Sequence, residues 1–450
     1  MTKKKVRIWN GNVRDAALSI LLAVDKNQAY SNLLLTQTIN KYNIEAKDRA
    51  LLTELTYGTL QHKYTLDYYL KPFIRGKVEL WVQWLLRLSL FQMEYLSRIP
   101  NHAIVNEAVE IAKRRGHKGV ASMVNGVLRS ILRKGVPSLL EIEDPIERLS
   151  IETSHPKWLV EMFVEDYGFE KTAEMLKENN RTPQQTVRVN TLKATVTEAM
   201  EKLEEEGLEV SQSPVVPECI YIHKGQPART KAFKEGLITI QDESSMLPAI
   251  ALNPAPGSRV LDMCAAPGGK TTHIAQIMNN EGSILALDLH PHKLELIDEN
   301  STRLAIDIID TAPLDGRKAS GHLKEESFDA ILVDAPCSGL GVMRRKPDIK
   351  YTKQKEDFDL LHVLQLELLE SAVKLLKPGG TLVYSTCTVN VKENEETVRA
   401  FLSSHSEMKL VPMKHLPKQL IEAQQDGMLQ VFPQDFGSDG FFVAVFEKEK

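Results

Sequence analysis

From Ser258 onward, short apolar runs of strand length alternate with longer segments of helical periodicity. The apolar runs are RVLDMC, SILALDL, FDAILVDAP and TLVYSTC, and the helical segments include HKLELIDENSTRLA and DFDLLHVLQLELLESAVKLL. Such alternation is typical of βαβ units, in which crossover helices join parallel strands. The pattern predicts a doubly wound α/β domain over residues 241–450. The segments GMLQVFP and FFVAVFEK predict an antiparallel hairpin at the edge of its sheet.

Further domains are expected ahead of this one, because one hydrophobic core rarely serves more than roughly 250–300 residues and the chain has 450. Residues 1–140 predict an all-helical bundle, since apolar side chains recur at helical spacing, as in Val105, Ala108, Val109 and Ala112.

Residues 141–240 predict linker helices and then a small α+β, RRM-like subdomain. The segment SHPKW begins one of these helices, and Ser154 is its expected N-cap. The runs TVRVNTL, LEVSQS, CIYIH and LITIQ have the length and composition of strands, and TVTEAMEKLEEEG reads as a helix ended by Gly207.

Charge is unevenly distributed along the chain. Residues 1–140 hold 22 Lys and Arg against 10 Asp and Glu, a balance of +12, and the rest of the chain has a balance of −16. A basic arm on an acidic body indicates a polyanionic partner, although a solvated Lys-rich helical surface would give the same balance.

Four cysteines are too few for a disulfide scaffold, and none forms a CxxC pair, so neither zinc nor another metal is expected. This usage favours a reducing, cytoplasmic compartment. The start MTKKKVRIWN followed by AALSILLAV resembles a signal peptide, but the apolar run ends in Asp25 without a small-residue cleavage site. We interpret it as an amphipathic helix.

The segment LDMCAAPGGKTTH contains a glycine loop between a strand and a helix. Its end looks like a phosphate-binding P-loop, but Cys264 stands where that motif needs its first glycine. Small residues still allow a ligand to approach the backbone and the helix N-terminus. Asp288 ends the next strand, where a carboxylate typically binds ribose hydroxyls. Its alternative role is to cap the following helix. The loop and Asp288 fit either a dinucleotide or S-adenosylmethionine (SAM).

Two cysteines follow the next strands of the pattern. Cys337 comes just after ILVDAP, and Cys387 just after LVYST. With strand order 3-2-1-4-5 these strands are neighbours, so the two thiols are expected to face each other beside the cofactor. A pyrimidine C5-methyltransferase needs such thiols, because C5 of cytosine becomes nucleophilic only after a thiolate adds to C6. Asp334 is suitably placed to bind the N3/N4 edge of the base.

The motifs CAAPGGKTTH, LVDAPCSGLGV, RRKPDIK, YSTCTVN and DGFF together resemble those of the Fmu/Sun family of RNA cytosine-C5 methyltransferases. The resemblance covers about residues 181–446 and implies a Rossmann-like SAM-dependent methyltransferase domain. The front end, from NVRDAALSILLAVDKNQAYSN to YGTLQHKYTLDYYL, resembles the NusB fold. That combination implies methylation of a specific cytosine in 16S ribosomal RNA, free or in a 30S assembly intermediate, by a monomeric enzyme.

Carried over by motif, the resemblance assigns Cys387 as the nucleophile and Cys337 as the thiol that assists product release, with Tyr384, Ser385 and Thr386 positioning Cys387. The chemistry of the two thiols alone does not choose between them. The implied SAM contacts are Cys264, Ala265, Ala266, Pro267, Gly268, Gly269, Lys270, Asp288, Asp315 and Asp334. Of these, Asp315 also fits a simple turn residue.

Candidate RNA contacts are Arg344, Arg345 and Lys346, which follow the Cys337 loop, and Arg114 and Arg115 in the basic arm. A solvated charge run and a favourable helix-dipole position are the alternative interpretations. Three other functions stay open: the same chemistry on transfer RNA, an RNA-binding assembly factor with incidental methyl transfer, and, least favoured, a P-loop ATPase.

Overall fold

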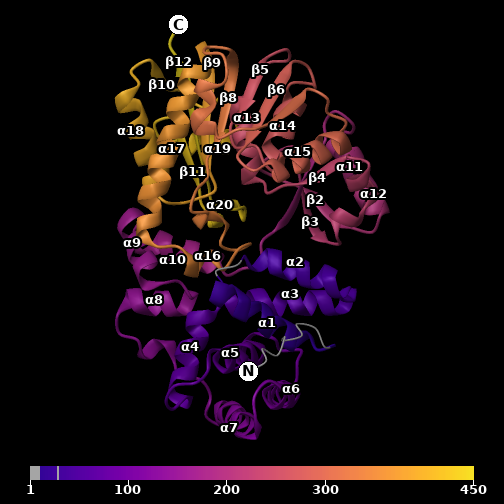
Figure 1. The fold of residues 1–450 in the computed structure, drawn as a ribbon, viewed down its shortest axis with the longest axis vertical. Helices are drawn as coiled ribbons and strands as arrows, with labels where there is room; N and C mark the ends of the chain where they lie inside the picture. The colour runs from indigo at the N-terminus through magenta and orange to yellow at the C-terminus, as the bar shows by residue number, and fades with distance from the viewer. Residues whose placement is uncertain (1–10, 28–29) are drawn as a thin grey trace. The chain divides into compact units, whose positions relative to one another are not determined.

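A computed structural model describes residues 11–27 and 30–450, which form two compact units (Figure 1). The first unit holds the chain up to Asn180 together with the later segment Met343–Thr352. The second unit holds Arg181–Val342 and Lys353–Lys450. The segment MTKKKVRIWN lies outside the described residues, whereas AALSILLAV lies within a helix. None of the helices in the described ranges is long and apolar enough to cross a membrane.

The first unit is all-helical, which confirms the prediction for the front end. Its helices are α1 (Val13–Asn27), α2 (Ser31–Tyr42), α3 (Ala46–Gln61), α4 (Lys63–Leu70), α5 (Leu80–Tyr95), α6 (Asn101–Arg115), α7 (Lys118–Lys134), α8 (Pro145–Thr153), α9 (Lys157–Tyr167), α10 (Phe169–Glu178) and α16 (Ile349–Thr352). The core forms where α1, α3 and α5 bury leucines on facing sides, among them Leu18, Leu52 and Leu86.

The prediction that Ser154 caps a helix N-terminus is wrong. Ser154 follows the end of α8 in a left-handed conformation with φ of 55°, and α9 begins three residues later at Lys157. The Ser154 hydroxyl instead accepts a hydrogen bond from the backbone N–H of Tyr64 at 2.9 Å. A tertiary partner therefore outcompetes the local capping role that the sequence indicates.

The second unit begins with the small antiparallel sheet that the sequence predicts. Its elements are β1 (Gln185–Val189), α11 (Val196–Glu205), β2 (Glu209–Gln212), β3 (Cys219–Lys224), α12 (Lys231–Lys234) and β4 (Ile238–Ile240), and the strand order is β2-β3-β1-β4. A capping box between Thr195 and Glu198 starts α11, and Cys219 is fully buried in the packed interior.

The main sheet has the strand order β10-β12-β9-β8-β5-β6-β7, with β11 added on β12. Its strands are β5 (Arg259–Asp262), β6 (Ser283–Asp288), β7 (Ile309–Pro313), β8 (Phe328–Asp334), β9 (Leu376–Thr386), β10 (Met408–Leu410), β11 (Met428–Val431) and β12 (Phe441–Lys448). Strands β5 to β9 pair in parallel, and β10, β11 and β12 pair antiparallel. The observed order of β5 to β9 is the order 3-2-1-4-5 assumed for these strands, and the antiparallel pairing of β11 with β12 confirms the expected hairpin.

Helices cover both faces of this sheet, as a doubly wound fold requires. On one face, α13 (Leu247–Leu252) and α14 (Gly269–Ile277) pack on Val260, Leu332 and Val383. On the other, α17 (Lys355–Leu375) and α18 (Thr397–Ser404) pack on Ile331 and Tyr384. The remaining helices are α15 (Pro291–Leu304), α19 (Lys418–Glu422) and α20 (Pro433–Phe436). Burial on both faces explains why the strands read as continuous apolar runs.

Two helical glycines in the front bundle have opposite surroundings. A Cβ at Gly58 in α3 would lie 2.0 Å from Cζ of Phe91, whereas a Cβ at Gly126 in α7 would meet nothing within 4 Å. We expect Gly58→Ala to lower the stability by about 1–3 kcal/mol through overpacking. Gly126→Ala should raise the stability by about 0.5–1 kcal/mol, because alanine has less conformational freedom than glycine to lose when the helix forms. Thermal midpoints of the full chain measure both, and a gain for Gly58→Ala would contradict the packing.

Candidate active site

The strand order reverses between β5 and β8, and ligands of doubly wound sheets bind at the carboxyl ends of strands beside such a switch point. The glycine loop follows β5 there and leads into α14, which begins at Gly269. Gly268 has a φ of 95°, and a Cβ on it would lie 3.2 Å from Cα of Ile297. A Cβ at Gly269 would make only ordinary contacts, with Gln241 at 3.8 Å. Gly268 is therefore required by the backbone, and the start of α14 stays open to a ligand.

Four carboxylates surround this loop. Burial raises the pKa of Cys264 well above its usual value, and the nearby charges of Asp262, Asp334, Asp288 and Asp315 raise it further. All four aspartates therefore lie close enough to Cys264 to influence its pKa, and Cys264 stays a neutral, partly buried thiol.

Two of these aspartates also have local partners. The Oδ1 atom of Asp288 accepts a hydrogen bond from the backbone N–H of His290 at 2.9 Å. Asp315 caps a short helical turn and accepts two side-chain hydrogen bonds from Arg317, at 3.0 and 2.7 Å. The hydrogen bond from Arg317 lowers the pKa of Asp315 although burial opposes it. The turn role considered for Asp315 is thus present, and its contact with a cofactor remains a prediction.

Asp334 links the loop to the cysteine region. Its Oδ2 atom accepts a hydrogen bond from Nζ of Lys270 at 2.7 Å, and its Oδ1 atom accepts one from the Ser385 hydroxyl at 2.8 Å. Burial alone would lower the pKa of Lys270, but the Asp334 carboxylate outweighs burial and raises it. Lys270 is therefore a cation, and it also lies 5.1 Å from the centroid of the Phe441 ring.

The two predicted catalytic cysteines face each other. The Sγ atoms of Cys337 and Cys387 are 3.4 Å apart, and the two residues do not form a disulfide. The parallel register that pairs Asp334 of β8 with Ser385 of β9 produces this approach, since each cysteine follows the end of its strand. The hydrogen bond to Cys387, together with burial, raises the pKa of Cys337 well above its usual value. Cys337 therefore retains its proton beside Cys387.

Two carboxylates that sequence reasoning did not single out lie at this site. Glu393 is fully buried and accepts hydrogen bonds from Ser338, the residue after Cys337. Asp262 ends β5 and is also buried; its Oδ2 atom accepts a hydrogen bond from the Thr271 hydroxyl at 2.7 Å. Among the described residues, its Oδ1 atom has no hydrogen-bond partner. A charged residue closing an apolar strand directly before the glycine loop is the sequence signal that indicates Asp262.

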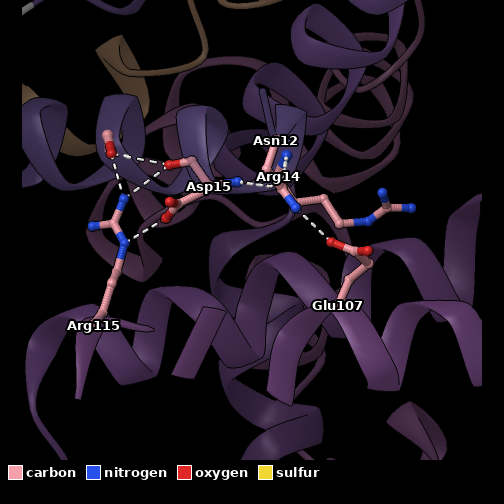
Figure 2. Close-up of polar contacts among 6 residues, drawn as sticks. Asn12, Arg14, Asp15, Glu107 and Arg115 are labelled. Atoms are coloured by element: carbon pink, nitrogen blue, oxygen red, sulfur yellow. Dashed lines mark hydrogen bonds and ion pairs between the residues drawn. The ribbon is translucent and has the colours of Figure 1, made fainter. Parts of the chain in front are cut away.

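The predicted RNA contacts differ in their surroundings. Arg344 is buried and donates to Glu178 at 2.9 Å within the first unit, whereas Lys346 is exposed and Arg345 is half-buried. Arg115 is tied to Asp15 by an ion pair of 2.5 Å and by a hydrogen bond to the Asp15 carbonyl (Figure 2). Arg114 is exposed.

Helices α6 and α7 form a groove of about 550 Å³ lined by Lys113, Lys118, Asn106 and Asn125, and by Glu110, which pairs with Lys113 at 2.6 Å. Its lining therefore offers cationic and amide donors. For the described ranges, no group of three or more His, Cys, Asp or Glu side chains is arranged to hold a metal ion.

Three family models match the chain. Residues 11–133 match the NusB family, residues 155–229 match the ferredoxin-like domain of the RsmF/B-like methyltransferases, and residues 249–447 match the 16S rRNA methyltransferase RsmB/F model. These matches cover the helical bundle, the small sheet with the helices before it, and the main sheet.

Two curated relatives span nearly the whole chain. The probable ribosomal RNA small subunit methyltransferase B of Bacillus subtilis (strain 168) is 51% identical over 442 residues, covering 97% of this chain and 99% of that protein. The ribosomal RNA small subunit methyltransferase B of Pseudomonas syringae pv. tomato is 35% identical, covering 96% of each chain.

Solved structures from Pyrococcus horikoshii are also similar. A methyltransferase homolog protein is 30% identical with a TM-score of 0.60, covering 68% of this chain and all of that one. NSun6 with SFG, a SAM analogue, is 25% identical with a TM-score of 0.58, covering 66% of this chain and 98% of that one.

Asp262 gives the site a testable pH dependence. Burial raises its pKa to about 7, so the folded protein binds a proton that the unfolded chain releases near pH 4. Stability from this group is therefore present at low pH and lost as the pH rises through about 7. Relative to wild type, we expect Asp262→Asn to gain about 3 kcal/mol of stability as the pH rises from 5 to 8, since each pH unit below the folded pKa of about 7 contributes about 1.4 kcal/mol. Thermal midpoints of both proteins at the two pH values measure this, and parallel curves would contradict it.

Proposed function

Because the chain belongs to the RsmB/F family of 16S rRNA methyltransferases, we propose that it transfers the methyl group of SAM to C5 of one cytosine in 16S ribosomal RNA through a covalent cysteine adduct. The observation that carries the proposal is the pair of thiols 3.4 Å apart, next to the Lys270–Asp334 pair at the end of neighbouring strands. Neither a P-loop ATPase nor a dinucleotide-dependent enzyme has a general use for that arrangement.

The residues of the crevice fit SAM. The open first turn of α14 suits a carboxylate of the ligand, and Asp288 at the end of β6 suits its ribose hydroxyls. The unpartnered oxygen of Asp262 and the surrounding carboxylates suit its positively charged groups. When bound, SAM supplies the methyl group that C5 accepts with release of the thioether product.

The chain's own residues perform the remaining chemistry. The Cys387 thiolate adds to C6 of the cytosine, so that C5 becomes enamine-like and takes the methyl group. The C5 proton then passes to a base such as solvent water. The bond between Cys387 and C6 breaks with return of its electron pair to sulfur. The neutral Cys337 thiol is placed to donate a hydrogen bond to the departing Cys387 thiolate, and Asp334 to hold the N3/N4 edge of the base.

This role assignment comes from the family motif, and the surroundings of Cys337 support it. Either thiol can donate the hydrogen bond that joins Cys337 and Cys387, and this bond together with burial raises the pKa of Cys337 well above its usual value. A thiol that keeps its proton is a poor nucleophile, since the thiolate is the reactive form. The charge of a Cys387 thiolate in turn helps to raise the pKa of Lys270, after burial and Asp334 have acted. Both features support Cys387 as the nucleophile.

The substrate has to reach the thiols as an unstacked base, either extruded from a helix or already in a loop. We assign RNA contact to the exposed cations Arg114 and Lys346 and to the groove between α6 and α7. Arg115 and Arg344 serve internal ion pairs and support these surfaces indirectly. We further propose that the enzyme is a cytoplasmic monomer. Its substrate is 16S RNA, either free or in a 30S assembly intermediate.

Variants of the two cysteines test the roles. We expect Cys387→Ala to abolish methyl transfer, because no thiolate then activates C5. Cys337→Ala should complete the first methyl transfer but leave a protein–RNA adduct, visible as a denaturant-resistant band. Adduct formation by Cys387→Ala instead would reverse the assignment.

Substrate choice is tested with labelled SAM. Purified 16S ribosomal RNA, transfer RNA and small-subunit assembly intermediates are each incubated with the enzyme, and the product is mapped by bisulfite sequencing. We expect label at one cytosine of 16S RNA. Label in transfer RNA alone would overturn the substrate, and full cellular function of both Cys→Ala variants would favour an assembly factor.

A further inference from the structure

The Glu393 carboxylate is a buried acid that the reaction scheme leaves unused. Glu393 lies in a π-helical turn, η7 (Lys392–Glu396), six residues after Cys387, and its side chain is completely buried. Burying a carboxylate is unfavourable unless donors surround it, and burial raises the pKa of Glu393. The hydrogen-bond donors around the Glu393 carboxylate therefore indicate its role.

Those partners bracket Cys337. The Ser338 backbone N–H donates to Glu393 Oε2 at 2.8 Å, and the Ser338 hydroxyl donates to Oε1 at 2.5 Å. Gln365 of α17 donates to Oε2 at 3.2 Å and also to the carbonyl of Pro336 at 3.0 Å. The residues on both sides of Cys337 are thus fixed to one carboxylate, directly on one side and through an amide on the other.

The same network reaches the second cysteine. The hydroxyls of Ser338 and Thr388 are 2.8 Å apart, and Thr388 directly follows Cys387. The Gly341 backbone N–H donates to the Cys387 carbonyl at 3.0 Å. The Tyr384 hydroxyl donates to the Glu393 carbonyl at 2.6 Å, which ties η7 to β9. The buried Glu393 carboxylate and its hydrogen-bond partners therefore hold the two cysteine loops, and with them the two sulfur atoms, next to each other.

We propose that Glu393 is a positioning residue for product release, which holds the Cys337 loop so that its thiol stays in contact with Cys387. This inference rests on the proposed function and deepens it. Glu393 acts on the Cys337 loop through its hydrogen bonds with Ser338 and Gln365. Its negative charge also adds to the influences that keep Cys337 protonated, after the hydrogen bond to Cys387 and burial.

The chemistry explains why release is the sensitive step. Addition of Cys387 to C6 and the first methyl transfer need only the nucleophile and the base in place. Breaking the bond between Cys387 and C6 returns an electron pair to sulfur, and a donor held 3.4 Å away stabilises that thiolate. A displaced Cys337 loop would therefore slow release more than methyl transfer.

The test separates the first turnover from later ones. Glu393→Gln keeps the shape but presents an amide, which cannot accept from Ser338 at both positions. In a single turnover with labelled SAM we expect near-normal methylation of the RNA. Steady-state turnover should fall about tenfold or more, with accumulation of the protein–RNA adduct. Ser338→Ala, which loses only the hydroxyl donor, should show a smaller loss of the same kind.

Glu396→Gln is the matched control, because Glu396 is exposed in the same helical turn. Combining Glu393→Gln with Cys337→Ala should add little to the adduct left by Cys337→Ala alone, since both act on one step. Thermal midpoints and SAM affinity identify variants that lose the fold, and Ser338→Ala then decides the question.

Unchanged turnover in Glu393→Gln and Ser338→Ala would overturn the inference. So would an equal loss of first-turnover and steady-state methylation, which would make Glu393 a support of the nucleophile or of the fold. Failure of the proposed function looks different, because wild type itself would then place no label on cytosine.

Discussion

The parallel hydrogen bonds between β8 and β9 fix the register on which the site depends. They set Asp334 opposite Ser385, and the cysteines that follow these strands meet at 3.4 Å. A slip of one residue would reverse the direction of every side chain on a strand and separate the thiols. Because helices cover both faces of the sheet, such a slip would also move apolar residues such as Leu332 and Val383 out of the packed layer that they fill and into the opposite one. Packing far from the crevice thus protects the geometry within it.

Within the crevice, several carboxylates lie close to the two thiols. Asp262, Asp288, Asp315 and Asp334 surround the glycine loop, and Lys270 offsets part of their charge through its pair with Asp334. Lys270 is held as a cation by that partner against the effect of burial. The glycine loop is therefore linked to the thiols as well, because Lys270 at its end forms an ion pair with Asp334, the acid next to the two cysteines.

Basic residues in the helical unit show how differently similar side chains are used. Arg115 completes an ion pair with Asp15 inside the bundle (Figure 2), while Arg114 is exposed. Lys350 is fully buried and donates to Asn180 Oδ1 at 2.6 Å, and burial lowers its pKa well below the usual value. Much of the motif RRKPDIK therefore stabilises the first unit, into which Met343–Thr352 is built.

The sequence by itself determined the three kinds of domain and the alternation of strands and helices in the last of them and, once the strand order 3-2-1-4-5 is assumed, the approach of Cys337 to Cys387. These follow from local periodicity and from the rule that parallel strands present their carboxyl ends at one edge. The tertiary structure alone decided that Ser154 accepts from Tyr64, that Arg344 is buried against Glu178, and that Glu393 joins the two cysteine loops. Periodicity tells which face of an element is apolar. It does not tell which polar group from a distant segment will lie opposite. The partners of Glu393, Ser154 and Arg344 named above are between 55 and 166 residues away along the chain. Their roles depend on desolvation and hydrogen-bond geometry, which exist only once the chain has folded.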